Sequence, residues 1–222
     1  MDIDCFFSKY GLPDTPAAGL QSHILFSKEF PRKGYRLEIK PLCLQSDIPI
    51  VHRWTTQPYT QKFWQVQCSV EELYNQYLKL LKEGMLNAFI VLLKGLYVAQ
   101  VDVYPVLKDE LAAHYPAQPT DFGLHLLMAP YKNIIRSYPR RLEHLSQDVL
   151  ITALSFLFSS GSIQRAVAEP DCRNGTANLL AQEVGFRMIK KIQLSYKEAN
   201  LYEYTKDAFL KRHPVTDAEQ YP

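Results

Sequence analysis

Long apolar runs near the middle of the chain give the strongest indication of its fold. Residues 88–93 and 96–104 are almost continuously hydrophobic and are separated only by Lys94 and Gly95. Continuous apolar strands are typical of central positions in a sheet, where both faces are covered. The remaining strands are predicted over residues 24–30, 35–41, 122–128, 163–168, 187–196 and 200–205.

Turn and capping residues mark where several of these elements begin and end. Residues 31–34 contain proline and glycine, so the first two predicted strands are expected to form a hairpin. Ser69 and Glu72 form a capping box that opens a helix reaching about residue 83. Asp47 is expected to cap a short helix over residues 48–55.

Two further helices are predicted in the second half of the chain. Apolar residues recur at helical spacing from about Leu142 to Gly161, so this segment is expected to bury one face. A second helix is predicted to begin at Gly175 and to end at Gly185, since glycine is the commonest residue after a helix C-terminus. The buried face of the first helix comprises Val149, Leu150, Ala153, Leu154 and Leu157.

The order of elements indicates a single domain of the α/β (mixed α+β) class. It is assigned to residues 23–210, with the polar, proline-containing residues 109–120 as a connection. Residues 1–22 carry two glycines and two prolines, which favour an irregular N-terminal arm. Residues 211–222 are assigned to a C-terminal tail.

Composition is that of an ordinary globular domain and narrows the class of partner. The chain has 222 residues, of which 47% are hydrophobic and 22% charged, enough for one packed core. A net charge of +2 gives no reason to expect a nucleic-acid partner. No apolar run reaches the roughly 20 residues of a membrane helix, and the first residues are acidic rather than basic. We therefore expect a cytoplasmic protein without membrane contact.

The cysteines give no indication of a metal site. Cys5, Cys43, Cys68 and Cys172 are far apart and form no Cys-x-x-Cys unit. Free thiols are the simpler interpretation, and neither a bound metal nor a disulfide framework is expected.

Two motifs carry a resemblance to a known family. Residues 122–128 read Phe-Gly-Leu-His-Leu-Leu-Met, residues 169–174 read Glu-Pro-Asp-Cys-Arg-Asn, and residues 183–186 read Glu-Val-Gly-Phe. Together they resemble the second half of a GNAT-type acyl-CoA N-acyltransferase. The pair Gly-x-His-Leu-Leu and Glu-Pro-Asp-x-Arg-Asn is similar to the subfamily that acylates N-hydroxylated lysine or diamines during hydroxamate siderophore assembly, as in aerobactin-type pathways. The mycobactin lysine acyltransferases are a related group, and the resemblance covers about residues 35–209.

This resemblance implies a fold, a reaction and a set of partners. The fold would be a GNAT-like domain with a central, mostly antiparallel, splayed sheet flanked by helices. The reaction would use acyl-CoA, with acetyl-CoA as the expected donor, and a small amine or hydroxylamine as acceptor. Other siderophore biosynthesis enzymes would be its partners, and a homodimer is one of the assemblies open to it.

His125 and Asp171 are the candidate catalytic residues. Acyl transfer from a thioester needs a neutral amine and a group that takes its proton. Histidine suits that role because its unperturbed pKa of about 6.5 lies near working pH. Asp171 could orient a substrate hydroxyl or stabilise an imidazolium, and the resembling subfamily assigns this His and Asp to catalysis. In the alternative interpretation, His125 is a hydrogen-bonded core residue and Asp171 an N-cap for the helix that begins near Asn174.

Aromatic and polar residues elsewhere are candidates for the acceptor pocket. His52 and Trp54 match the subfamily's His-x-Trp element, whose side chains help to shape the amine pocket. Trp64 and Tyr104 are added on their aromatic character, and Arg173 on its place in the Asp-x-Arg-Asn turn. An aromatic residue packed on a short helix is otherwise a core residue.

The segments expected to bind the cofactor depart from the family pattern. The family carries Gln/Arg-x-x-Gly-x-Gly/Ala before the helix that follows the His-bearing strand, since bare backbone N–H groups must approach a pyrophosphate. Here residues 141–146 read Arg-Leu-Glu-His-Leu-Ser, with His144 and Ser146 where small residues are expected. A basic cluster could hold the phosphates instead, or could be a solvated loop. The candidate cofactor-binding residues are Leu127, Met128, Arg136, Arg140, Arg141, His144, Leu145, Ser146 and Asn174.

Three functions remain open at this point. The first is an acyl-CoA-dependent N-acyltransferase that converts an N-hydroxylated lysine or diamine to a hydroxamate. The second is a GNAT enzyme acting on another amine, because a fold does not choose its acceptor. The third is a non-catalytic GNAT-like binding module, which the missing glycines at residues 141–146 would suggest.

Overall fold

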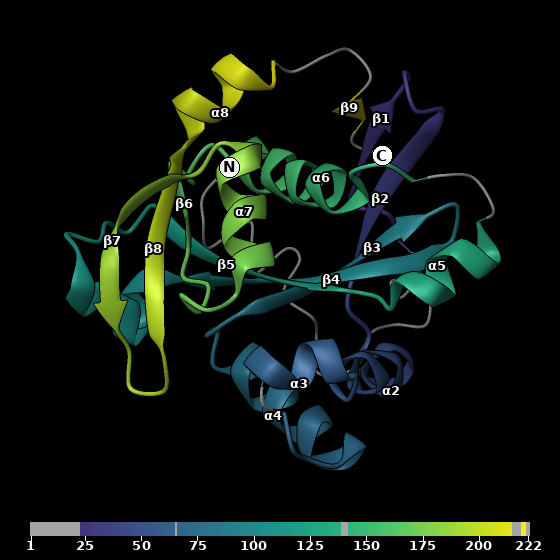
Figure 1. The fold of residues 1–222 in the computed structure, drawn as a ribbon, viewed down its shortest axis with the longest axis horizontal. Coiled ribbons are helices and arrows are strands. Elements are labelled where there is room, and N and C mark those ends of the chain that lie inside the picture. The colour runs from purple at the N-terminus through teal and green to yellow at the C-terminus, as the bar shows by residue number, and fades with distance from the viewer. Residues whose placement is uncertain (1–22, 65, 139–141, 215–218, 221–222) are drawn as a thin grey trace.

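One mixed sheet organises the molecule. The computed structural model describes residues 23–64, 66–138, 142–214 and 219–220, so the expected arm over residues 1–22 lies outside the described residues. Within them, nine strands form a single sheet in the order β7-β8-β6-β5-β4-β3-β2-β1-β9 (Figure 1). The strands are β1 Phe26–Phe30, β2 Tyr35–Pro41, β3 Asn87–Leu93, β4 Leu96–Pro105, β5 Asp121–Met128, β6 Arg165–Ala168, β7 Arg187–Gln193, β8 Glu198–Thr205 and β9 Glu219–Gln220.

The pairing confirms a mostly antiparallel sheet. Every neighbouring pair is antiparallel except β5 and β6, which run parallel. The β1–β2 hairpin and the two central strands β3 and β4 form as predicted, and all seven residues of β3 are buried. The predicted strand over 187–196 ends early, at Gln193, because Leu194 N donates to Lys197 O and turns the chain towards β8. Strand β6 begins at Arg165 rather than Ile163.

The helices agree with the capping residues in most places. Ser69 and Glu72 form both halves of the predicted capping box at the start of α4. The prediction that Asp47 caps a helix at residue 48 was wrong. Helix α2 begins at Leu44, and Asp47 lies in its first turn, where its carboxylate accepts a hydrogen bond of 2.9 Å from Cys43 N. The helices are α2 Leu44–Thr55, α3 Pro58–Trp64, α4 Val70–Lys82, α5 Tyr131–Ser137, α6 Leu145–Ser159, α7 Gly175–Val184 and α8 Lys206–Arg212, with 3-10 turns η1 Val106–Lys108 and η2 Glu110–His114.

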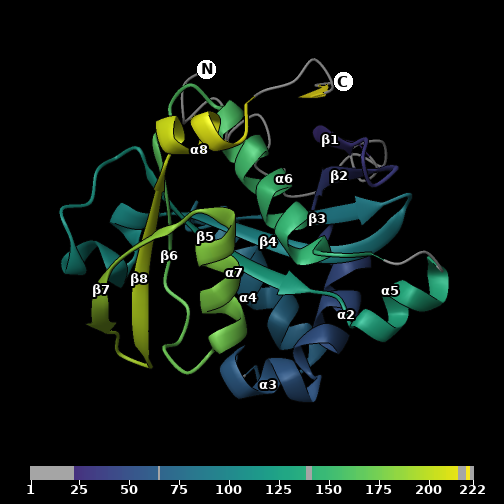
Figure 2. The same cartoon turned by 45° about the horizontal axis from the view of Figure 1, so that its top comes forward.

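Helices cover both faces of the sheet. Helices α2, α3 and α4 lie on one side, and α6 and α7 lie on the other (Figures 1 and 2). The predicted buried face of α6 is confirmed, since Val149, Leu150, Ala153, Leu154 and Leu157 are all buried. Phe156 of the same helix packs against Phe26 and Phe89, with ring centroids 5.9 Å and 5.1 Å apart, so α6 is anchored to the sheet. The core therefore continues from the sheet into this helical layer.

The sheet opens between its two parallel strands. Strands β5 and β6 pair only from Asp121 to Gly123 and from Arg165 to Val167, after which β6 ends and β5 continues to Met128. The second half of β5 therefore has no strand partner on its β6 side among the described residues. This is the splay that the sequence led us to expect.

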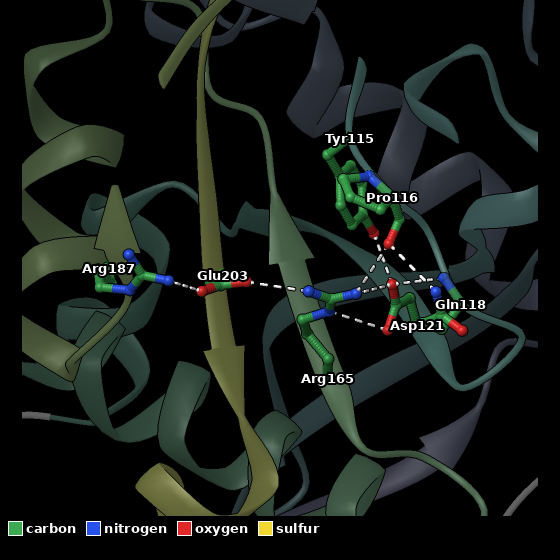
Figure 3. Close-up of polar contacts among 7 residues, drawn as sticks. All are labelled: Tyr115, Pro116, Gln118, Asp121, Arg165, Arg187 and Glu203. Atoms are coloured by element: carbon green, nitrogen blue, oxygen red, sulfur yellow. Dashed lines mark hydrogen bonds and ion pairs between the residues drawn. The ribbon is translucent and has the colours of Figure 1, made fainter. Parts of the chain in front are cut away.

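Charged side chains hold the other end of this opening closed. Arg165 of β6 donates to Asp121 of β5 through Nε at 2.9 Å and Nη2 at 2.6 Å, and to Glu203 of β8 through Nη1 at 3.1 Å. Glu203 also pairs with Arg187 of β7, so the ion pairs cross four strands (Figure 3). Since Asp121 is buried and Arg165 half-buried, these pairs fix the register at the closed end of the opening.

Candidate active site

A cavity of about 230 Å³ lies where β5 and β6 separate. Leu124, His125 and Leu126 are consecutive in β5, so their side chains alternate between the two faces of the sheet, and all three line the cavity. The cavity therefore reaches both faces of the sheet. Its remaining lining residues are Phe63, Trp64, Leu150, Ala168, Glu169, Pro170, Asp171, Asn174, Ala177, Leu180, Ala181, Phe186, Tyr196 and Lys197.

A histidine–carboxylate pair stands in this cavity. His125 Nε2 lies 2.8 Å from Glu169 Oε1, and the side chains are 38% and 3% exposed, respectively. Burial alone would raise the pKa of Glu169, but the charge and hydrogen bond of His125 outweigh it and lower that pKa to about 2. Burial alone would lower the pKa of His125, but Glu169, with a contribution from Asp102, raises it. The two groups therefore stabilise each other in their charged forms.

The polarity of this pair fixes the tautomer of the imidazole. An ionised carboxylate can only accept hydrogen bonds, so Nε2 of His125 must carry a proton. In the neutral ring the free lone pair then lies on Nδ1, which makes no hydrogen bond to any residue that the structure describes. His125 thus presents a proton acceptor whose orientation is set by a buried carboxylate.

Tyr104 completes the support of the pair from the neighbouring strand. Its hydroxyl donates to Glu169 Oε2 at 2.8 Å, and its ring centroid is 4.9 Å from that of His125. Tyr104 and Gly123 are direct partners in the β4–β5 ladder, and a Cβ placed on Gly123 would lie 1.9 Å from the tyrosine ring. The glycine two residues before His125 is therefore needed for the tyrosine to reach Glu169.

Asp171 lines the same cavity but contacts a different partner. Arg173 donates from Nε and Nη2 to its two carboxylate oxygens at 2.9 Å and 2.6 Å, and its backbone N donates at 2.8 Å. The Arg173 hydrogen bonds hold the pKa of Asp171 at about 2. Asp171 and His125 form no hydrogen bond or ion pair with each other in the described residues; the carboxylate bonded to the imidazole is Glu169. Asp171 is also not the helix cap, because Asn174 caps α7 by accepting from Ala177 N at 3.2 Å.

The residues proposed for an acceptor pocket separate into two groups. Trp64 lines the cavity, and its ring centroid is 6.0 Å from that of His125. The ring of Tyr104 also packs against His125. His52 instead contacts Cys68 O through Nε2 at 2.7 Å, and Trp54 is buried beside a second cavity of about 370 Å³, which Arg53 and Tyr97 also line. Arg173 is 69% exposed, pairs with Asp171 and is not among the lining residues of the first cavity.

The candidate cofactor residues on β5 and α7 lie at or near the opening. Leu127 is buried, and Met128 O accepts a hydrogen bond of 3.1 Å from the Tyr59 hydroxyl. Asn174 lines the cavity at the start of α7. Arg136 is exposed near the end of α5, a helix that the sequence reading missed, and Arg140 and Arg141 lie outside the described residues.

The start of α6 holds the other cofactor candidates. His144 is the N-cap residue with φ 57° and ψ 31°, a left-handed conformation that favours glycine, and Leu145 and Ser146 open the helix. Lys33, from the β1–β2 turn, was not anticipated here; its Nζ donates to Glu143 O at 3.2 Å and to Asp148 at 2.6 Å. Lys33 therefore holds in place the start of α6, where the family pattern has glycines.

Two charged residues of the cavity, Glu169 and Lys197, were not among the predicted site residues. Glu169 stands in the Glu-Pro-Asp motif, and its place at the end of a buried strand could have marked it as a buried carboxylate. Lys197 lies in the β7–β8 turn, 3.6 Å from Glu169 Oε1, and the sequence placed it in the connection between two predicted strands. Neither spacing nor composition distinguishes it from the other lysines nearby.

The described residues contain neither a cluster of metal-binding side chains nor a membrane-spanning helix. In the part of the chain that the structure describes, no three His, Cys, Asp or Glu side chains gather closely enough to hold a metal ion. No described helix is long and apolar enough to cross a membrane.

Comparison with known protein sequences gives a family match and distant relatives. A family model described as the acetyltransferase (GNAT) domain matches residues 43–194. The lysine N-acyltransferase MbtK of Mycolicibacterium paratuberculosis is 24% identical over 158 residues, which cover 70% of this chain and 68% of MbtK. The N(6)-hydroxylysine O-acetyltransferase of Escherichia coli is 24% identical over 160 residues, 70% of this chain and 48% of that protein. The chain therefore spans about half the length of that relative.

Solved structures share the fold. A protein from Bacillus halodurans, described as uncharacterized, superposes with a TM-score of 0.74 at 21% identity, covering 86% of this chain and 95% of that one. The aminoglycoside acetyltransferase AAC(6')-Ib in complex with coenzyme A superposes with a TM-score of 0.69 at 16% identity, covering 80% and 99%. At these identities the likeness establishes the architecture alone.

Proposed function

Because this chain belongs to the GNAT acetyltransferase family, we propose that it transfers an acyl group from acyl-CoA to an N-hydroxylated lysine or diamine and so forms a hydroxamate for siderophore biosynthesis. One observation carries the proposal. His125, oriented by buried Glu169, faces a cavity at the point where the sheet opens and the β5 backbone loses its strand partner.

The open part of β5 offers a place for the acyl-CoA. Past Gly123, β5 has no strand beside it on the β6 side among the described residues, so backbone groups there are free to pair with a ligand. The cavity continues between this strand and the apolar side chains Leu150, Leu180 and Ala181 of α6 and α7. These residues fit the pantetheine arm of an acyl-CoA, which supplies the thioester carbonyl to be attacked.

The apolar side chains that line the cavity cannot bind the phosphates of acyl-CoA, so these phosphates are proposed to bind polar groups at the start of α6. The first turn of that helix has no side-chain cap, and helix N-termini favour anions. Arg136, Arg140 and Arg141, together with the residues around His144, are the groups proposed to hold the phosphates.

On the opposite side of β5, His125 serves as the general base. When the acceptor nitrogen attacks the thioester carbon, a C–N bond forms, the C–S bond breaks and the sulfur leaves as a thiolate. The proton lost by nitrogen passes to Nδ1 of His125, and Glu169 stabilises the imidazolium that results. That proton can then neutralise the departing thiolate, so charge and atoms balance.

An N-hydroxylated acceptor suits this modest base. The nitrogen of a hydroxylamine is less basic than that of an alkylamine, so it is largely uncharged near neutral pH and needs positioning more than deprotonation. Asp171, on the cavity wall with its pKa held at about 2, is the group proposed to orient the acceptor hydroxyl. The name of the Escherichia coli relative, N(6)-hydroxylysine O-acetyltransferase, contains such an acceptor, and the name of MbtK contains the parent amine lysine.

Product analysis tests this function. Purified protein is incubated with acetyl-CoA and either N6-hydroxylysine or N-hydroxycadaverine, and the products are analysed by mass and by colour with ferric iron. We expect a product that gains one acetyl group and forms a coloured ferric hydroxamate. A product of the same mass without ferric colour would indicate O-acylation, and acylation of unhydroxylated amines alone would indicate a different acceptor.

Replacement of His125 tests its role directly. His125→Ala should lower turnover by about 10²-fold or more while acyl-CoA affinity, measured by titration, changes little, because a general base acts in the transition state. Near-normal turnover in the variant would show that His125 only packs in the cavity wall.

A further inference from the structure

Lys197 occupies an unusual position for a lysine. It is the last residue of the connection 194–197 between β7 and β8, yet its side chain is only 15% exposed and it lines the cavity. The loop is held in place because Ser195 Oγ donates to Glu110 Oε1 of η2 at 3.1 Å. The lysine is therefore directed inwards by an anchored turn.

Among the described residues, its ammonium group has no hydrogen-bond acceptor. Nζ lies 3.6 Å from Glu169 Oε1, beyond hydrogen-bond distance, and makes no hydrogen bond to any residue in the described part of the chain. Both oxygens of Glu169 already accept from other groups, His125 and Tyr104. An ammonium has three donors, and because Lys197 lines the cavity, an acceptor on a bound reactant can reach them there.

The ammonium group of Lys197 lies close to the imidazole of His125, so its acceptor is expected to be part of a reactant. Lys197 Nζ and His125 Nε2 contact the same carboxylate oxygen, at 3.6 Å and 2.8 Å, so the ammonium is a near neighbour of the group proposed to take the proton. The other charged groups of the wall are matched, since His125 pairs with Glu169 and Arg173 with Asp171. Lys197 is the lining cation left without a hydrogen-bonded anion among the described residues.

We propose that Lys197 binds a carboxylate carried by one of the two reactants and so selects that reactant. This proposal rests on the proposed function for the identity of the reactants. The carboxylate can come from the acyl donor, as the free end of a dicarboxylic acyl group such as succinyl. It can also come from the acceptor, as the α-carboxylate of an amino acid such as N6-hydroxylysine. Either would give the ammonium a charge-assisted hydrogen bond inside the cavity.

Binding titrations on matched reactants distinguish the two sources. Wild type, Lys197→Met and Lys197→Arg are titrated with succinyl-CoA and acetyl-CoA, and with N6-hydroxylysine and N-hydroxycadaverine. Lys191→Met is the control, because Lys191 lies on the same hairpin but is 59% exposed and pairs with Glu198. Thermal unfolding of each variant verifies that it is folded.

We expect a loss of binding affinity for only one compound, either succinyl-CoA or N6-hydroxylysine. Lys197→Met should weaken binding of the carboxylate-bearing member by at least about tenfold, with its counterpart nearly unchanged and with Lys197→Arg close to wild type. A loss for succinyl-CoA identifies the donor, and a loss for N6-hydroxylysine identifies the acceptor. Equal losses for both members of each pair would mean that Lys197 only supports Glu169 and would overturn the proposal, as would no loss at all.

Turnover measured on the same proteins keeps the two proposals separate. If wild type binds these compounds but acylates neither hydroxylamine, the proposed function fails while the titrations still decide the role of Lys197. If wild type acylates a hydroxylamine but the titrations show no carboxylate-dependent loss, only the role of Lys197 fails.

Discussion

Side chains from three separate segments meet at the carboxylate of Glu169. Glu169 accepts hydrogen bonds from His125 of β5 and Tyr104 of β4, and Lys197 of the β7–β8 turn lies 3.6 Å away. The sequence identified His125 and Tyr104 from motif and aromatic character, because those signals are local. It could not identify Glu169 as the partner of His125, since the choice between Glu169 and Asp171 depends on which side of the turn each faces.

The pH dependence of catalysis should report this choice of partner. A protonated imidazole cannot accept a proton, so activity should fall as pH drops through the pKa of His125. Glu169 raises that pKa against the lowering effect of burial. In Glu169→Gln the lowering effect remains, so the acid limb of the kcat/KM profile should move to lower pH, together with a reduced maximum.

Asp171→Asn is the matched control for that profile. Asp171 lines the same cavity but contacts Arg173 rather than the imidazole, so its replacement should move the acid limb less than Glu169→Gln does. If Asp171→Asn moved the limb more, Asp171 would be the effective partner of His125 in solution.

At the scale of strands and helices, periodic and apolar patterns were sufficient for most elements. The strands β3 and β4 were predicted because their apolar runs are long, and α4 because its capping box is local. Helices α3 and α5 were missed because each is short and buries a single residue, Thr60 and Ile134, so neither shows a helical stripe. Helix α3 nonetheless contributes Phe63 and Trp64 to the cavity at the opening.

The fit between β4 and β5 gives a prediction at this scale. In Gly123→Ala the new Cβ would meet the ring of Tyr104, which is buried and hydrogen-bonded to Glu169 and therefore cannot move freely. We expect a loss of about 1–3 kcal/mol in the free energy of unfolding, together with lower turnover, because Tyr104 is displaced from Glu169. Denaturant unfolding and steady-state kinetics measure the two effects.

Gly175→Ala provides the comparison for this substitution. Gly175 begins α7, and a Cβ there meets nothing within 4 Å, so stability and turnover should both stay near wild type. Equal behaviour of the two alanine variants would mean that Gly123 is not required for the position of Tyr104.

For the molecule as a whole, the place where β5 and β6 separate is set by the ion pairs that hold the two strands together at their other end. The sequence predicted a splayed sheet only through family resemblance, since composition does not show where two strands separate. The structure supplies the physical reason, because Arg165, the first residue of β6, fixes the start of this short strand to Asp121 of β5 and Glu203 of β8 (Figure 3). Such long-range ion pairs join residues far apart in sequence and leave no periodic signal.

Removal of this arginine should destabilise the whole domain. Arg165→Met leaves the buried carboxylate of Asp121 without its cation, so unfolding free energy should fall by about 3 kcal/mol in denaturant titrations. Arg36→Met is the control, because the Arg36–Glu38 pair lies at the surface and should contribute less than about 1 kcal/mol. Equal losses in the two variants would show that the Arg165 pairs contribute no more than a surface contact.

The selection of an N-hydroxylated acceptor is tested most directly by kcat/KM for N6-hydroxylysine and for lysine, measured with one acyl-CoA from pH 7 to pH 10. We predict a strong preference for the hydroxylated acceptor at pH 7. The preference should shrink as pH approaches the amine pKa of about 10.4, because lysine then loses the proton that blocks its attack. The same trend should hold for N-hydroxycadaverine against cadaverine. Equal efficiency towards the hydroxylated acceptor and its parent amine at pH 7 would contradict the assignment.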